Sequence, residues 1–174
     1  MVNDINTKVI GSNISIKLDM DKSYDRVEWN FVIRVMRCMG FFELTIDLFF
    51  RSIGSPWFSI TFMGKSYGFF KAARGLRQGD PLSPSVFILV QDAFSRYLIK
   101  SSVEGRVRSF RCRLNFYGLT HLFFVDNLLI FTNGSSRTIQ ALNQILNFYS
   151  HWSGQLINRG KCSFFVSKSC MERR

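Results

Sequence analysis

The sequence has few residues of several kinds, and each scarcity excludes a class of protein. Its four cysteines form no C-x-x-C pair and its two histidines lie far apart, which argues against a disulfide framework and a zinc site. No apolar run is long enough to cross a bilayer, and the N-terminus has no signal-peptide pattern. Only three prolines occur, and no linker-like stretch divides the chain. We therefore expect one soluble, intracellular domain without a membrane partner, in either the nucleus or the cytoplasm.

Acidic residues are also scarce. The chain has 12 Asp and Glu against 23 Lys and Arg, which gives a formal net charge of +11. A surplus of this size favours a polyanionic partner, most simply nucleic acid. Part of the positive charge is clustered in one stretch, at Arg106, Arg108, Arg111 and Arg113. Aromatic residues are abundant by contrast, with 19 Phe among 174 residues, so the chain can bury a sizeable core.

Hydrophobic periodicity predicts both strands and helices. Residues 13–21 alternate between apolar and polar, as in a strand with one buried face, and Asp19 lies on the polar face. Asp25 and Ser83 stand where helix caps are favoured. Helices are predicted at residues 25–39, 43–53, 84–100 and 136–151. Strands are predicted at residues 57–62, 67–72, 119–125, 128–132 and 162–167, with 106–116 as strand or loop.

Without its insertions, this order is β-α-β-β-α-β, the split βαβ (ferredoxin-like) core of an α+β domain. In such a sheet the end of the first strand and the turn of the central hairpin can be neighbours, which would bring Asp19 next to Asp126. Paired carboxylates suit two-metal phosphoryl transfer, because Mg²⁺ prefers oxygen ligands. Spacing alone leaves this open, since Asp and Asn are also favoured in turns and the topology hosts many functions.

Four motifs make the hypothesis specific. They are KLDMDKSYDRVEW at residues 17–29, RGLRQGDPLSP at 74–84, LFFVDN at 122–127, and SGQLIN at 153–158 followed by Lys161. In this order and spacing, over residues 11–167, they resemble the catalytic motifs of reverse transcriptases from plant LINE-type (non-LTR) retrotransposons. The resemblance implies that residues 1–174 are a single partial reverse transcriptase domain, a polymerase palm with the fingers and thumb missing.

The resemblance also implies a catalytic centre. Asp19 and Asp126 would hold two Mg²⁺ ions, with Mn²⁺ as a possible substitute. Lys161 would protonate the departing pyrophosphate, although a lysine in a solvated turn is the plain structural alternative. Asn127 stands where the family carries a second aspartate, so the site would keep an oxygen ligand but lose one negative charge. Together with the missing fingers and thumb, this change predicts a relic of a transposable element with weak or no activity.

Substrate-binding residues follow from the same resemblance. Tyr24 would pack under the sugar of the incoming nucleotide, and its structural alternative is a core tyrosine in a strand-to-helix turn. Gln78 and Gly79 would contact the nucleotide and the template-primer, whereas an ordinary loop before a helix is the alternative for Gly79. The implied partners are an RNA template, a DNA primer and deoxynucleoside triphosphates, as for any RNA-directed DNA polymerase among the nucleotidyltransferases.

Two other interpretations stay open. The first is a non-catalytic, basic nucleic-acid-binding module, because the β-α-β-β-α-β order with a basic charge also describes an RNA-recognition motif. Residues 65–70 partly fit the aromatic strand signature of that motif, but the match fails at Ser66, where glycine is required, and at Ala72, where an aromatic residue is required. Such a module would depend on Tyr67 and Phe69 and would ignore Mg²⁺, whereas a polymerase palm would depend on Asp19, Asp126 and the metal. The second is an inactive pseudogene product.

Overall fold

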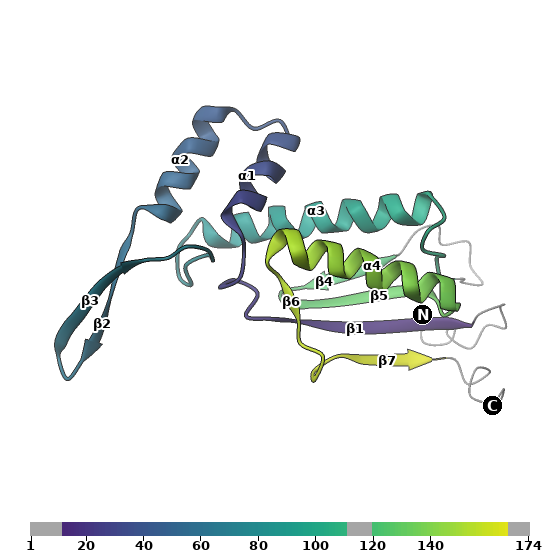
Figure 1. The fold of residues 1–174 in the computed structure, drawn as a ribbon. Helices are drawn as coiled ribbons and strands as arrows, with labels where there is room; N and C mark the ends of the chain where they lie inside the picture. The colour runs from purple at the N-terminus through teal and green to yellow at the C-terminus, as the bar shows by residue number, and fades with distance from the viewer. Residues whose placement is uncertain (1–11, 111–119, 167–174) are drawn as a thin grey trace.

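A computed structural model describes residues 12–110 and 120–166, and its centre is an antiparallel sheet (Figure 1). The strand order is β4-β5-β1-β6, and β7 also pairs with β1. The strands are β1 Asn13–Asp21, β4 His121–Phe124, β5 Asn127–Asn133, β6 Leu156–Ile157 and β7 Ser163–Val166. With β6 and β7 taken as one position beside β1, this is the strand order of the split βαβ arrangement. The predicted α+β core is confirmed.

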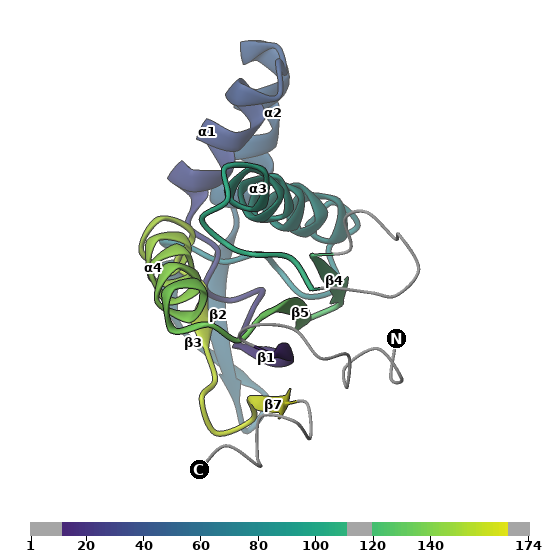
Figure 2. The same cartoon turned by 90° about the vertical axis from the view of Figure 1, so that its right-hand side faces the viewer.

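Helices cover one face of this sheet. Within the described residues they are α1 Trp29–Cys38, α2 Glu43–Gly54, α3 Ser83–Val103 and α4 Ser136–Ser153. Figures 1 and 2 show α3 and α4 lying across the same face, with α1 beside α3 and α2 leading away from the body. The core forms where Leu18, Leu128 and other buried strand residues meet the helices. Phe94 of α3 stacks on Tyr149 of α4 with 4.0 Å between ring centroids, which joins the two helices above the sheet.

The hairpin β2–β3 stands apart from the main sheet. Its strands, β2 Trp57–Phe62 and β3 Lys65–Lys71, pair only with each other and project from the body (Figure 1). The turn is Met63-Gly64, both with positive φ, as the twist of a two-residue hairpin requires. The predicted hairpin is confirmed, although β3 begins two residues earlier than expected. An RNA-recognition motif would carry its aromatic strand in the main sheet, so this interpretation does not fit the topology.

Two predicted helix starts are wrong. Helix α1 begins at Trp29 with Glu28 as its N-cap, so Asp25 caps no helix and lies in a turn. Helix α3 begins at Ser83 itself, whose buried hydroxyl has no hydrogen-bond partner. The N-cap residue is Leu82, and no side chain caps the helix. The Asp80 carboxylate accepts a 2.8 Å hydrogen bond from the Leu82 N–H, which fixes the turn that leads into α3. At Asp25 the local signal is overridden by contacts of this turn with the loop at residues 75–78.

The remaining differences are small: β4 and β7 are shorter than predicted, the two-residue strand β6 was not predicted, and β5 and the helices α2, α3 and α4 are slightly longer. Helix α4 runs to Ser153 and ends at Gly154, whose φ of 75° is the left-handed cap typical of a helix end. Helix α3 continues three residues beyond the expected end, to Val103. Arg111 and Arg113 of the basic stretch, and the ends of the motif-bearing region at residues 11 and 167, lie outside the described residues. Among the helices in the described ranges, none combines the length and apolar character that crossing a membrane requires.

Candidate active site

The register of β1 and β5 brings the predicted metal-site residues together. Asp19 is paired directly with Asn127 across the antiparallel strands. The next residue, Met20, donates its N–H to the carbonyl of Asp126 at 3.0 Å. Directly paired residues have Cβ atoms about 4.5–5.5 Å apart, so oxygens on these side chains lie within reach of a shared cation. All three polar side chains are half-buried at the end of the central strand.

The donor set at this point fits a hard divalent cation. The Asn127 side-chain nitrogen donates to Asp126 Oδ1 at 2.9 Å, while Asn127 Oδ1 is buried and has no hydrogen-bond partner. A buried acceptor without a partner calls for a ligand or a water, and carboxylate and amide oxygens are ligands that Mg²⁺ accepts. Across residues 12–110 and 120–166 no cluster of three or more His, Cys, Asp or Glu could hold a metal. The available set is therefore two carboxylates and one amide.

The turn that carries Asp126 is strained and is held by α3. Val125, between β4 and β5, has a φ of 54°, a conformation that a β-branched residue adopts only when its surroundings impose it. The Gln91 side-chain amide of α3 donates to the Val125 carbonyl. Gln91 was not among the predicted site residues, because a glutamine in the middle of a helix gives no signal of a contact 34 residues away.

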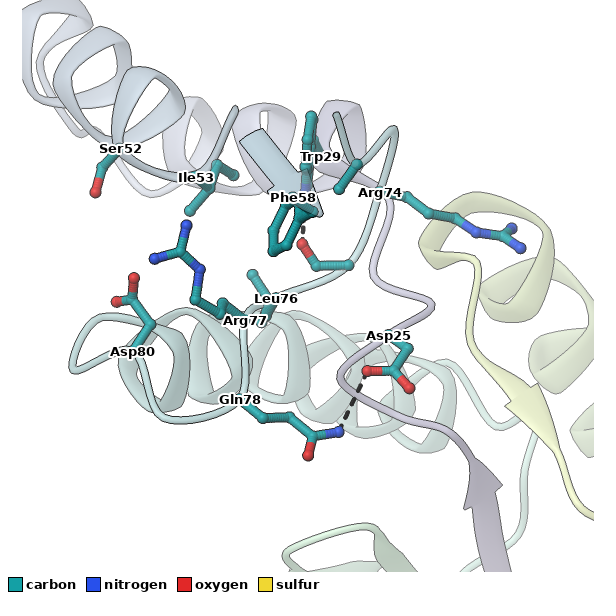
Figure 3. A pocket seen from close by; sticks show the side chains of 12 residues that line it. Asp25, Trp29, Ser52, Ile53, Phe58, Arg74, Leu76, Arg77, Gln78 and Asp80 are labelled. Carbon is teal, nitrogen blue, oxygen red and sulfur yellow. Dashed lines mark hydrogen bonds between the residues drawn. The ribbon is translucent and has the colours of Figure 1, made fainter. Parts of the chain in front are cut away.

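The second motif lies directly on the turn that follows β1. Gly75 N–H donates to the Val27 carbonyl and Leu76 N–H donates to the Tyr24 carbonyl, both at 2.8 Å. The Trp29 indole N–H donates to the Gly75 carbonyl at 2.7 Å (Figure 3). A Cβ on Gly75 would lie 2.7 Å from the Asp25 carbonyl oxygen. Only glycine therefore allows this close approach of the two backbones.

The predicted substrate-binding residues meet at one pocket. Tyr24, Gln78 and Gly79 line a cavity of about 540 Å³ together with Asp80 and the start of α3. Gln78 also donates to Asp25 Oδ1 at 3.3 Å (Figure 3), which is the contact Asp25 makes instead of capping a helix. The Tyr24 ring stacks on Phe87 of α3 at 4.6 Å between centroids. Tyr24 is thus partly packed against the core, as its structural alternative predicted, and also lines the pocket.

The fourth motif closes the same turn from the other side. Gln155 is 1% exposed, and its side-chain amide donates to the Ser23 carbonyl at 2.6 Å. A Cβ on Gly154 would lie 2.3 Å from the Arg26 carbonyl oxygen, so α4 ends against this turn. Gln155 belongs to the fourth motif, but no role was predicted for it. Its place directly after a helix-ending glycine was the available signal.

Lys161 lies in the turn between β6 and β7. This turn is tied to β1, because Asn158 N–H donates to the Asp19 carbonyl at 2.8 Å and Lys161 N–H donates to the Asn158 carbonyl at 3.1 Å. The Lys161 side chain is exposed. The structure therefore brings the backbone of Lys161 close to the end of the central strand, on an exposed turn.

All four motifs converge around one turn, at the end of the central strand of a split βαβ sheet. This arrangement is the palm of a nucleic-acid polymerase. The chain belongs to the reverse transcriptase (RNA-dependent DNA polymerase) family, whose family model matches residues 2–172.

Relatives and solved structures agree with this family. The chain is 27% identical over 150 residues to the retrovirus-related Pol polyprotein of the type-1 retrotransposable element R2 of Popillia japonica, covering 85% of this chain and 23% of that protein. It is 39% identical over 82 residues to an uncharacterised mitochondrial protein of Arabidopsis thaliana, covering 47% of this chain and 63% of that protein. Telomerase of Candida tropicalis, in complex with a fragment of telomeric RNA, superposes with a TM-score of 0.66 at 17% identity, covering 94% of this chain and 28% of that chain.

The similarities to relatives and to solved structures support statements of different scope. The resemblance to non-LTR retrotransposon reverse transcriptases is confirmed, while the plant origin stays a prediction. The telomerase similarity shows the fold alone. The chain spans about a quarter of the length of the R2 polyprotein, which therefore contains much more than the part that matches this chain.

Proposed function

We propose that this chain, as part of one reverse transcriptase domain, performs RNA-directed DNA synthesis through a two-metal site at Asp19 and Asp126. The observation that carries the proposal is the β1–β5 register, which pairs Asp19 with Asn127 and ties Met20 to Asp126. The buried, unpartnered Asn127 Oδ1 supports it further, because it is a free oxygen ligand beside both carboxylates. Membership of the reverse transcriptase family supplies the reaction class.

Asp19 and Asp126 hold the cations in this proposal, and Asn127 contributes a neutral oxygen. When bound, two Mg²⁺ ions would lower the pKa of the attacking hydroxyl and neutralise the leaving oxygen. Asn127 leaves the site one negative charge short of a second aspartate, so cation affinity falls. We therefore propose that the chain turns over slowly, and that Mn²⁺ can replace Mg²⁺.

Substrate binding is proposed for the loop before α3, which packs against the turn that follows β1. Tyr24, Gln78 and Gly79 line the 540 Å³ pocket and are proposed to bind the deoxynucleoside triphosphate and the paired end of the RNA template and DNA primer. The Tyr24 ring, held by Phe87, is a flat surface for the nucleotide sugar. Lys161, on the turn tied to Asp19, is proposed to protonate the departing pyrophosphate.

Primer extension on an RNA template tests the proposal, with Mg²⁺ and separately with Mn²⁺. The wild-type chain is expected to extend slowly. Asp19→Ala should reduce extension by more than roughly 100-fold, since even partners outside the ligand shell are worth roughly 10–100-fold at metal sites. Asn127→Asp should raise extension most at limiting Mg²⁺. Asp47→Ala is the matched control, because this carboxylate lies on α2 and pairs with Arg51 at 2.9 Å.

The outcomes separate three interpretations. Extension that disappears with Asp19→Ala and persists with Asp47→Ala supports a working palm. A gain confined to Asn127→Asp locates the defect at the cation site. An absence of extension in every variant, with each shown to be folded, would refute the enzymatic proposal and leave a nucleic-acid-binding remnant.

A further inference from the structure

The hairpin β2–β3 carries a continuous apolar face. Its cross-strand pairs are Phe58 with Phe70, Ile60 with Tyr67, and Phe62 with Lys65. Residues 58, 60 and 62 alternate along β2, so they share one face of the hairpin. The register shifts between Phe58 and Ile60, where β3 has one extra residue at a bulge that includes Gly68, and this bulge keeps Phe70 and Tyr67 as the partners on that face. We name this surface the aromatic face, made up of Phe58, Ile60, Phe62, Tyr67 and Phe70.

The aromatic face is exposed within the described part of the chain. Ile60 is 63%, Phe62 64%, Tyr67 52% and Phe70 49% exposed. Phe58 and Phe70 stack at 5.9 Å between ring centroids, so these two rings are held together near the base of the hairpin. The hairpin projects from the body (Figure 1). Neighbouring exposed apolar side chains of this kind are typical of an interaction surface.

The charged residues beside the aromatic face indicate which kind of partner it binds. At the base of the hairpin the Arg77 guanidinium lies 5.5 Å from the centroid of the Phe58 ring, and at the tip Lys65 is paired with Phe62. Residues 57–71 contain no Asp or Glu. Protein–protein interfaces are depleted in lysine, whereas surfaces for single-stranded nucleic acid combine cations with aromatic rings on which bases stack. The composition therefore favours nucleic acid over a protein partner.

The aromatic face is continuous with the candidate active site. Phe58 lines a cavity of about 260 Å³ together with Asp25, Arg77 and Gln78 (Figure 3). Gln78 also lines the 540 Å³ pocket with Tyr24. A nucleic-acid strand that leaves that pocket past Gln78 and Arg77 would reach Phe58 and then the rest of the aromatic face. We propose that the aromatic face stacks the bases of the unpaired RNA template; the identity of this strand as template rests on the proposed function.

Equilibrium binding of a fluorescent single-stranded RNA dodecamer without self-pairing tests the proposal, in EDTA and without nucleotide. Phe62→Ala and Tyr67→Ala are each expected to weaken binding roughly tenfold, from the usual contribution of base–aromatic stacking. Trp57→Ala is the matched control. Trp57 is 63% exposed on the same hairpin, but it is paired with Lys71 on the opposite face. Lys65→Gln should lower the slope of log affinity against log salt by about 0.7.

Each outcome of the binding assay either supports or overturns the proposed stacking surface. Binding weakened by Phe62→Ala and Tyr67→Ala, with Trp57→Ala unchanged and a blunt RNA duplex binding less tightly, supports the stacking surface. Affinities within twofold of wild type in the folded variants, equal losses in Trp57→Ala, or no measurable wild-type binding overturn it. A change of sedimentation without a change of affinity would make the face a protein contact. Primer extension reads the proposed function separately, because the binding assay needs neither Asp19 nor a metal.

Discussion

Gly75→Ala tests whether the second motif is held against the first by backbone contact. Gly75 has a φ of 89°, and a Cβ there would lie 2.7 Å from the Asp25 carbonyl oxygen. The obstacle is backbone rather than the flexible end of a side chain, so the loop must move away. That movement loosens the 2.8 Å hydrogen bonds from Gly75 to Val27 and from Leu76 to Tyr24.

The cost of this substitution has two parts. Holding alanine in the left-handed region costs about 1–2 kcal/mol. Two weakened hydrogen bonds add about 1 kcal/mol each. We therefore expect Gly75→Ala to lower the free energy of unfolding by about 3–4 kcal/mol, a large share of the roughly 5–15 kcal/mol of an ordinary domain. Because Gln78 lies in the same loop, the 540 Å³ pocket should be disturbed as well.

Urea denaturation followed by circular dichroism measures the effect, with Gly40→Ala as the matched control. Gly40 has a φ of 83°, but a Cβ there would meet no atom within 4 Å. It should therefore show only the conformational cost of about 1–2 kcal/mol. If Gly75→Ala destabilised the chain no more than Gly40→Ala, the close approach of the two motifs would not be what restricts this position to glycine.

Two further predictions concern buried polar groups. Gln155→Ala should lower the free energy of unfolding by about 1–3 kcal/mol, because the Ser23 carbonyl loses its buried donor; a loss below about 0.5 kcal/mol in urea denaturation would contradict this. Burial lowers the pKa of His121, which hydrogen-bonds with Thr120 and Ser95. The unfolded chain then binds the proton first, so stability should fall as the pH drops below about 6.5. The fall should be smaller in His121→Gln, measured by urea denaturation at several pH values.

Local patterns in the sequence foretold much of this fold. The alternation of residues 13–21 predicted β1 with its observed bounds, since a half-buried strand needs no other signal. The helical period up to residue 151 and the glycine at 154 predicted α4 and its end. The four motifs also identified the family, because their order along the chain is a property of the sequence alone.

Contacts between distant segments decided the rest. The capping prediction for Asp25 was wrong because the loop at Gln78, 53 residues away, offers it a different partner. The capping prediction for Ser83 was wrong for a local reason, since α3 already begins at that residue with Leu82 as its N-cap. A local sequence pattern predicts the contacts of a residue only with residues nearby in the chain, and not with segments that the fold brings next to it.

The register that pairs Asp19 with Asn127 is the clearest example of what only the tertiary structure decided. The sequence by itself placed Asp19 near the end of a strand, and Asn127 beside Asp126 in a hairpin turn. A slip of one residue between β1 and β5 would turn every side chain of one strand to the other face and separate Asp19 from Asp126. Packing of Leu18, Leu128 and Ile130 against the helices prevents this slip, because burial of all three at once allows one register.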